Sequence, residues 1–352
     1  MVVLSLFDGI SCGQLALKRA DICVDAYYAS EIEDSAKKIT LKNFPETVEI
    51  GDVTKVSYKD GTLTTECGVF EVGKIDLLLG GSPCTDFSSI GNTLGMQCEG
   101  EQILTYERYQ ELKNSGATFS GESYLFWEYV RLLKEVRPDY YLLENVVMSV
   151  QWENVITDTL ETTPVRINSS LVSAQNRPRL YWTNIKGVGT PEDMGIKLDD
   201  ILDTAASTED VCGSVIVRKS LPKLVTKYGY IPEKFNAYNV SVVGCKACTL
   251  SRGSMVTSSC ATLILTPCEN GLHGVVDGIM DDRYPVKVTD GRYNIRRLSI
   301  TEMERLQTLP DGYTEVKSVG KQKRGTALGN CWTVDVVAYI LSCINENVSE
   351  DW

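Results

Sequence analysis

The feature that most constrains this fold is an alternation of apolar runs and helical segments over the first 190 residues. Apolar runs of strand length occur at 2–7, 25–31, 47–53, 74–81, 139–147, 164–172 and 179–185. Helical periods lie between several of them, at 13–20, 34–44 and 121–138. This order predicts an α/β fold in which helices cover both faces of a mostly parallel sheet.

Polar residues and glycines follow five of these predicted strands in succession. They are the segment 7–13, Glu31, Asp52, the segment 80–84 and the segment 144–146. In open α/β sheets, ligands bind outside the carboxyl ends of the strands. We therefore expect these residues to converge on one edge of the sheet. The ordinary preference of turns for polar residues and glycine explains poorly why they follow five strands in succession.

The residue types at this edge suggest a cofactor that contains adenosine. A glycine-rich turn at 7–13 lets the backbone approach a nucleotide, although it is not a GxGxxG motif. Glu31 stands where a carboxylate grips ribose hydroxyls, and Asp52 is placed to accept a hydrogen bond from an adenine amino group. Cys84 then lies beside the expected cofactor as a candidate nucleophile. Glu144 is a candidate acid, able to protonate a ring nitrogen as sulfur adds.

Composition excludes several other classes of chemistry. His273 is the only histidine and lies in a glycine-rich stretch, which argues against Ser-His and Cys-His catalysis. The twelve cysteines are scattered and fit a reducing compartment. One CxxC occurs, Cys245 to Cys248, but the spacing of Cys260 and Cys268 fits no common zinc pattern, so no metal is expected.

The charge is uneven along the chain. The net charge of −12 argues against non-specific coating of nucleic acid. Basic segments nevertheless recur in the second half, at 177–179, 218–230, 292–297 and 317–324. No apolar run reaches the roughly 20 residues that cross a bilayer, and the first residues do not resemble a signal peptide. A cytoplasmic protein without membrane association is expected.

The alternation breaks between residues 190 and 292. This region is rich in Ser, Thr, Gly and Pro, has short apolar runs and shows no long helical period. Helical patterns return at 299–310 and 333–348. We expect a discontinuous catalytic domain formed by 1–189 and 293–352, with a smaller β-rich or irregular domain at 190–292.

Six motifs in order resemble the cytosine-C5 DNA methyltransferase family. They are FDGISCG, GGSPC, ENVV, QNRPR, RRLSITEMERLQTLPDGY and GNCWTVDVV, and they extend from residue 7 to residue 337. The Ser-Pro-Cys form is similar to that of phage and bacterial enzymes and of mammalian de novo methyltransferases. The resemblance implies a Rossmann-like fold, with residues 190–292 as the target-recognition domain. It implies double-stranded DNA as the substrate. The protein partners are left open, and so is the oligomeric state, for which a monomer is one alternative.

The resemblance also implies a role for each matching residue. S-adenosyl-L-methionine is the implied cofactor and S-adenosyl-L-homocysteine the product. Phe7 would stack on the adenine, Glu31 would bind the ribose, and Asp52 with Val53 would read the adenine edge. The full implied cofactor set is Phe7, Asp8, Gly9, Gly13, Glu31, Ile32, Asp52, Val53, Ser82, Pro83, Leu125, Asn330, Cys331 and Trp332.

In the implied reaction, a cytosine flipped out of the duplex is the substrate. Cys84 would attack its C6 atom, Glu144 would contact N3 and the amino group, and Arg179 with Arg177 would position O2. Two alternatives remain: a tRNA cytosine methyltransferase on the same catalytic frame, and an inactive regulatory member of the family. The segment 85–120 is longer than the loop usual in the family, and it is interpreted either as a solvated elaboration or as a contact to DNA or a partner.

Overall fold

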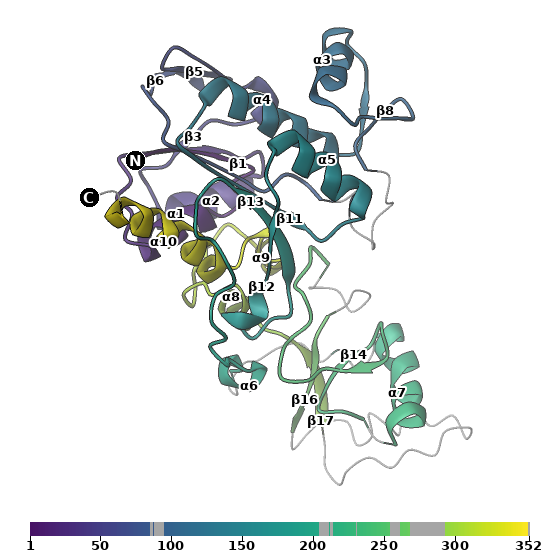
Figure 1. Cartoon of the computed structure of the whole chain (residues 1–352). Helices are drawn as coiled ribbons and strands as arrows, with labels where there is room; N and C mark the ends of the chain where they lie inside the picture. The colour runs from purple at the N-terminus through teal and green to yellow at the C-terminus, as the bar shows by residue number, and fades with distance from the viewer. Residues whose placement is uncertain are drawn as a thin grey trace. The chain divides into compact units, whose positions relative to one another are not determined.

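The apolar runs of the first 190 residues form one seven-stranded sheet in the computed structural model of the protein (Figure 1). The structure describes residues 1–84, 87, 95–203, 211, 214–229, 231–253, 261–267 and 293–350. The strands of this sheet, in spatial order, are β12 (Val165–Asn168), β13 (Pro178–Thr183), β11 (Tyr140–Val146), β7 (Leu77–Gly80), β1 (Val2–Leu6), β2 (Ala26–Ser30) and β3 (Val48–Glu49).

The sheet is mixed but mostly parallel, as expected. The strand pairs β1–β2, β2–β3, β1–β7 and β7–β11 are parallel, whereas β13 runs antiparallel to both β11 and β12. The strand order changes direction between β1 and β7, which is the topological switch point where such sheets bind ligands. Because β13 is reversed, its first residues lie at the edge where β11 ends.

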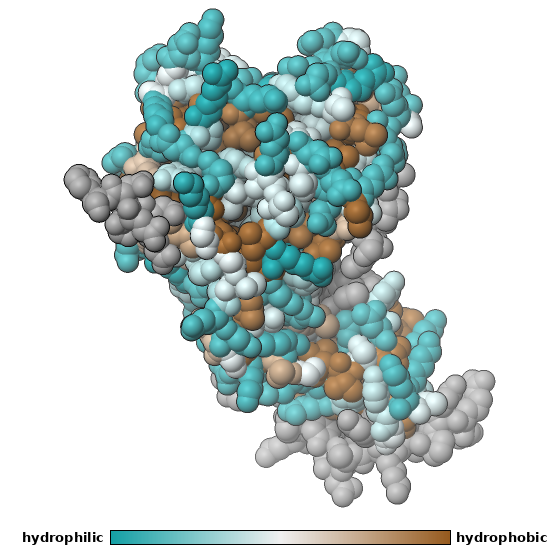
Figure 2. Space-filling model, viewed as in Figure 1, coloured by the Kyte–Doolittle hydropathy of each residue, from teal (hydrophilic) through white to brown (hydrophobic). Residues whose placement is uncertain are grey.

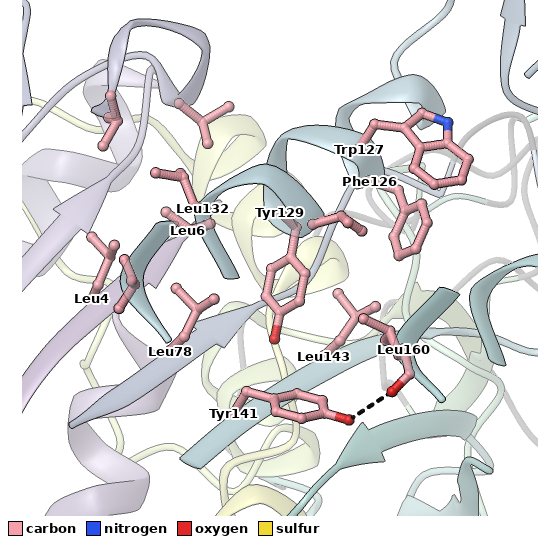
Figure 3. Packing of buried hydrophobic residues seen from close by; sticks show 14 of the residues in the cluster. Leu4, Leu6, Leu78, Phe126, Trp127, Tyr129, Leu132, Tyr141, Leu143 and Leu160 are labelled. Carbon is pink, nitrogen blue, oxygen red and sulfur yellow. Dashed lines mark hydrogen bonds between the residues drawn. The ribbon is translucent and has the colours of Figure 1, made fainter. Parts of the chain in front are cut away.

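Side chains of the central strands are buried on both faces of the sheet. Leu4 and Leu6 of β1 belong to a cluster with residues of α4 (Phe126–Val136) and α5 (Val150–Leu160). Figure 3 shows Tyr129 of α4 lying near Leu78 and Leu143 of neighbouring strands. A Cβ added to Gly80 would lie 2.6 Å from the Tyr129 ring, so this close packing of α4 on β7 requires glycine.

Helices α1 (Cys12–Arg19) and α10 (Val334–Glu350) pack together against the opposite face (Figure 1). Helix α2 (Asp34–Asn43) connects β2 to β3. The predicted α/β fold, with helices on both faces of a mostly parallel sheet, is confirmed.

The contacts divide the chain into two units. Unit 1 comprises Met1–Asn168, Pro178–Glu192 and Val334–Trp352, and unit 2 comprises Ser169–Arg177 and Asp193–Thr333. Unit 2 contains a four-stranded sheet with the order β15 (Ser241–Val242), β14 (Lys234–Asn236), β16 (Leu263–Pro267) and β17 (Tyr293–Arg297). Its helices are α6 (Leu198–Ile201), α7 (Val215–Tyr228), α8 (Ile300–Leu306) and α9 (Lys321–Asn330).

Unit 2 differs from expectation in two respects. Residues 293–333 pack within unit 2 rather than with the large sheet, because β17 pairs with β16 along five residues. The region 190–292 also contains a 14-residue helix, α7, where no long helix was expected. Its apolar positions Val217, Leu221 and Leu224 do have helical spacing, but Pro222 inside the segment reads as a breaker.

Two small sheets extend unit 1. The strands β4 (Ser57–Lys59), β5 (Thr62–Thr65) and β6 (Gly68–Glu71) form an antiparallel meander that the sequence did not predict. The other sheet has the order β10 (Phe119–Ser120), β8 (Gln97–Cys98) and β9 (Glu101–Gln102), and it accompanies α3 (Tyr106–Asn114). Short 3-10 turns lie at Val53–Lys55 (η1), Ser123–Leu125 (η2) and Ser169–Leu171 (η3).

The described part of the long segment 85–120 is anchored to α4. Tyr109 of α3 is buried, stacks on Trp127 and donates a hydrogen bond to Glu128. Lys113 and Arg131 form ion pairs with the same buried Glu128 carboxylate. The part of this segment that contains Tyr109 and Lys113 is therefore packed against α4. A contact of the segment with DNA or with a partner stays a prediction.

Among the helices in the described ranges, none is by itself long and apolar enough to cross a membrane. One bent pair, Lys321–Asn330 with Val334–Asn345, passes the same test of length and composition.

Candidate active site

The turn after β1 has the backbone conformation of a ligand-binding loop. Phe7, Gly9 and Ser11 all have positive φ, at 57°, 63° and 56°. The Gly9 amide donates a 2.8 Å hydrogen bond to Glu31 at the end of β2. A Cβ built on Gly9 would find no atom within 4 Å, so the turn borders open space. The glycine is required by its φ angle, and the space beside it is available to a ligand.

Glu31 is held in place by backbone donors. One carboxylate oxygen accepts from Gly9, and the other accepts from the amides of Ile32 and Glu33, at 2.7 and 2.8 Å. Burial nevertheless raises the pKa of Glu31 above its ordinary value. The Ile32 side chain is 70% exposed, which is unusual for isoleucine. A fixed carboxylate beside an exposed apolar side chain suits a ribose with its attached base.

Two further carboxylates lie near Glu31. Burial raises the pKa of Asp8, which accepts hydrogen bonds from Ser11 and Tyr27. Burial, with the nearby Asp8 and Glu31 charges, also raises the pKa of Glu49 to about 7. Both Glu49 oxygens are shielded from solvent and find no hydrogen-bond partner within the described residues. These unsatisfied acceptors fit a ligand that brings hydroxyl donors or positive charge.

The sequence reasoning did not identify Glu49. Its only signal was a charged residue inside the apolar run 47–53. Its proximity to Asp8 depends on the pairing of β3 with β2, where Glu49 lies opposite Ala29.

The turn after β3 is held by the β4–β6 meander. Asp52 caps the η1 turn by accepting from the Thr54 amide at 2.9 Å. The Asp52 amide in turn donates to Glu66 at 2.8 Å. Val53 is buried under this turn. Glu66 is thus a second residue that the sequence did not single out, because its role depends on an unpredicted sheet.

Cys84 lies at the end of the turn that follows β7. Its side chain is partly exposed, whereas Ser82 is buried. The side-chain amide of Asn145, at the end of β11, donates to the Ser82 carbonyl at 3.2 Å and to its hydroxyl at 3.1 Å. This contact ties the turn that carries the thiol to the strand that carries Glu144, a role for Asn145 that was not foreseen.

Glu144 and Arg179 form an ion pair on one face of the sheet. The distance from Arg179 Nε to Glu144 Oε1 is 2.9 Å, and both side chains are largely buried. The register places Glu144 opposite Tyr181 and Val146 opposite Arg179, so the two charged residues are diagonal neighbours across β11 and β13. The Arg179 guanidinium and the Glu144 carboxyl lie on β13 and β11, and β11 is next to β7, whose following turn carries the Cys84 thiol. Such a pair can hold a polar heterocycle by hydrogen bonds beside the thiol.

Arg177 makes different contacts, among them hydrogen bonds within unit 2. It is 3% exposed, and its guanidinium donates to the carbonyls of Leu250, Gly329 and Cys331 at 2.8 to 3.3 Å. A Cβ on Gly329 would lie 2.2 Å from the Ser251 backbone, so these segments are in close contact. Arg177 therefore joins the segment of Asn330, Cys331 and Trp332 to the segment that begins at Leu250.

The other predicted site residues have these positions. Gly13 is buried in the first turn of α1, Pro83 is half-buried between Ser82 and Cys84, and Leu125 is half-buried in η2. Cys331 is buried, while Asn330 at the end of α9 is exposed. His273 and residues 254–259 of the possible contact loop 251–259 lie outside the described residues.

Within the described ranges, no group of three or more His, Cys, Asp or Glu side chains is arranged to hold a metal ion. Cys248 instead accepts a hydrogen bond from Asn236 at 3.4 Å.

A family model provides the decisive comparison. The model for C-5 cytosine-specific DNA methylase matches residues 1–346. The chain belongs to this family. Members of the family are cytosine-C5 methyltransferases, and they generally use S-adenosylmethionine.

Curated relatives of this methyltransferase come from phages and bacteria. The orphan methyltransferase M.SPBetaI of Bacillus phage SPbeta is 29% identical over 208 residues, which cover 52% of this chain and 44% of that protein. The putative type II methyltransferase M.BsuMIIP of Bacillus subtilis strain 168 matches equally well. The matching part thus spans less than half the length of these relatives.

Solved structures share the fold of the whole methyltransferase chain. The Dnmt2 methyltransferase of S. pombe has a TM-score of 0.64 at 19% identity, with 99% of both chains covered. The methyltransferase EhMeth of Entamoeba histolytica has a TM-score of 0.65 at 13% identity, with 99% of this chain and 98% of that chain covered. At such identities, the likeness supports the fold alone.

Proposed function

We propose that the protein is a DNA (cytosine-5-)-methyltransferase that acts on a cytosine flipped out of duplex DNA. The observation that carries the proposal is the joint placement of the Cys84 turn and the Glu144–Arg179 pair, linked by Asn145 to Ser82. The phage and bacterial relatives named above favour DNA as the substrate. In this assignment, residues 190–292 contain the target-recognition domain.

The residues of unit 1 fit S-adenosylmethionine as the methyl donor. Glu31 accepts from three amides, which leaves about one of its roughly four acceptor sites for a ribose hydroxyl. The exposed Ile32 side chain offers an apolar contact to the base. The unsatisfied Glu49 carboxylate and the buried Asp8 favour a ligand with positive charge. S-adenosylmethionine supplies, when bound, an electrophilic methyl group on a cationic sulfur.

The chain's own groups then perform the base chemistry. The Cys84 thiolate forms a bond to C6 of the cytosine. Glu144 takes up a proton from water and passes it to N3, so that negative charge does not accumulate on the ring. Arg179 holds the Glu144 carboxyl and donates toward the pyrimidine O2. Addition at C6 makes C5 nucleophilic and able to take the methyl group. Water then takes the C5 proton as the C6–sulfur bond breaks. The Cys84 thiolate leaves with the electrons of that bond, N3 returns its proton to Glu144, and the C5–C6 double bond of the aromatic ring is restored.

We assign Arg177 to positioning rather than to contact with the base. Its guanidinium already donates to three main-chain carbonyls in a buried setting. Through these bonds, it holds the segment that carries Asn330 and Trp332, the residues proposed to close the methionine end of the cofactor site.

Transfer of a labelled methyl group to duplex DNA, with tRNA as the competing substrate, tests the function. We expect labelled 5-methylcytosine in DNA. Cys84→Ala should lower the rate by more than about 10³-fold, because the covalent route is lost. Labelling of tRNA alone would assign the tRNA reaction instead, and labelling of neither would favour a regulatory member of the family.

A duplex that carries 5-fluorocytosine tests the role of Cys84 directly. Fluorine replaces the C5 proton, so the thiolate cannot be expelled after methyl transfer and the protein stays attached to DNA. We expect a covalent complex with the wild-type protein and none with Cys84→Ala. A complex with the variant would show that another residue is the nucleophile.

A further inference from the structure

Helix α7 of unit 2 has one apolar face and one basic face. The apolar face is formed by Val217, Leu221 and Leu224, which are at most 1% exposed. They pack in a cluster with Phe235 of β14 and Leu263 of β16. The helix is thereby fixed to the sheet of unit 2, and its other face is presented to solvent.

The outer face of α7 carries only positive charge. Arg218, Lys219, Lys223 and Lys227 are exposed, and the sequence Val215–Tyr228 contains no acidic residue. Lys219, Lys223 and Lys227 follow at intervals of four residues, so each lies about 6 Å along the axis from the next. Like charges at this spacing destabilise a helix by about 0.2–0.5 kcal/mol per pair. Helix α7 contains no acidic residue that could offset this repulsion. A solvated helix with charges of both signs would contain such residues.

Figure 2 shows hydrophilic residues beside hydrophobic ones over the α7 side of this unit. Lys227 is partly engaged, because its ammonium donates to the Val240 carbonyl at 3.3 Å and lies 5.0 Å from the Tyr228 ring centre. Lys219 and Lys223 are therefore the clearest candidates to meet an anion.

The charge of the two units differs in sign. Unit 1 has 16 basic and 31 acidic side chains, whereas unit 2 has 19 basic and 16 acidic ones. A polyanion is thus repelled by unit 1 on average and attracted by unit 2. In unit 2, α7 is a long helix whose exposed charged residues are all basic.

We propose that the outer face of α7, centred on Lys219 and Lys223, binds the phosphate backbone of duplex DNA. The proposal rests on the proposed function and adds to it a contact that is independent of sequence. Lysine ammonium groups at this spacing provide charge and hydrogen-bond donors but cannot by themselves distinguish bases. The face therefore supplies affinity and register, and base reading is left to other segments.

The salt dependence of DNA binding tests the proposal. The double variant Lys219→Ala/Lys223→Ala is compared with wild type by titration into a short duplex of mixed sequence over a series of KCl concentrations. Each phosphate contact contributes about 0.9 to the slope of log K against log salt. We expect the slope to become shallower by up to about 1.8, with a similar loss of affinity for duplexes of different sequence.

Two control variants test whether a change in the salt slope has a cause other than the loss of phosphate contacts at α7. Lys38→Ala/Lys42→Ala on α2 of unit 1 removes two exposed lysines with the same spacing, and it should leave the slope unchanged. Lys219→Arg/Lys223→Arg keeps the charge and should retain the wild-type slope. An equal change with the α2 pair would overturn the proposal, because it would show an effect of net charge alone.

An unchanged slope in the α7 double variant would overturn the proposal even if methyl transfer to DNA proceeds normally. Absence of both DNA binding and DNA methylation in the wild-type protein would instead refute the proposed function. Thermal unfolding of the variant checks that α7 is still packed, and Val215→Lys, which adds charge at an exposed position of the same helix, should steepen the slope.

Discussion

Unit 1 and unit 2 use charged residues in opposite ways. Unit 1 gathers carboxylates at the strand ends, including Asp8, Glu31 and Glu49, and has a large excess of acidic side chains. Unit 2 has a small basic excess and a helix, α7, that contains basic but no acidic residues. The acidic unit suits a cationic cofactor, whereas the basic unit suits a polyanionic substrate. We therefore expect that mutations in unit 1 can lower the rate of methyl transfer without lowering the affinity for DNA, and that mutations in unit 2 can do the reverse.

The largest effect expected in unit 1, after loss of Cys84, is that of Glu144→Gln. Removal of a positioned general acid typically lowers a rate by 10²–10⁴-fold, and we expect a loss in that range. Single-turnover methyl transfer measures the chemical step, and a binding titration measures affinity for DNA, which should change little. A rate equal to wild type, or a matching loss of DNA affinity, would break the proposed separation.

A smaller effect is expected from Arg177→Ala, which tests unit 2. The variant leaves the carbonyls of Leu250, Gly329 and Cys331 without a buried donor. An unsatisfied buried polar group costs about 1–3 kcal/mol, so we expect a loss of roughly 3 kcal/mol in the free energy of unfolding. Denaturant titration measures it. If stability were kept while single-turnover methylation fell as strongly as in Glu144→Gln, Arg177 would belong to the chemistry instead.

The smallest effect is the pH dependence contributed by Glu49. Its pKa is raised to about 7 in the folded protein, above the value near 4.3 of an unperturbed glutamate. The folded state therefore binds this proton more tightly than the unfolded state does. The contribution of Glu49 to stability is fully present below about pH 4 and is lost as the pH rises through 7.

Glu49→Gln removes this titration. After allowance for solvent screening of a partly exposed group, we expect the variant to be more stable than wild type by on the order of 1 kcal/mol at pH 8. The difference should shrink as the pH falls and should vanish only at about pH 4, where Glu49 is protonated in both the folded and the unfolded state. Thermal unfolding at both pH values measures it, and a constant difference would show that packing rather than charge is responsible. Saturating S-adenosylmethionine should reduce the difference, because the cation stabilises the ionised form.

The strands of unit 1 were predictable because their apolar runs are long and bounded by polar turns. The run 77–80 and the run 140–146 each became a buried strand with the expected polar residues at its end. Cys84, Glu144 and Glu31 could be found in this way. Asn145, Glu49 and Glu66 could not, since their contacts depend on which strands pair and on a meander with no strong pattern.

Unit 2 was less predictable for a physical reason. Its elements are held by pairing between distant segments, such as β16 with β17, rather than by long local periods. Pro222 also obscured α7, although the apolar spacing around it was helical. The placement of 293–333 follows from that same distant pairing and has no local signal.

The pairing of β7 with β11 has a final consequence for selectivity. Leu142 lies opposite Leu79 and Leu143 opposite Gly80, and the Asn145–Ser82 bonds extend this register beyond the last paired residue. The register therefore holds the turn that precedes Cys84 against the end of the strand that carries Glu144. A slip of β11 by one residue would turn Glu144 to the opposite face of the sheet and move Asn145 away from Ser82. Under the proposed function, such a slip would separate the nucleophile from the acid, so selection for a cytosine depends on the pairing of two buried strands.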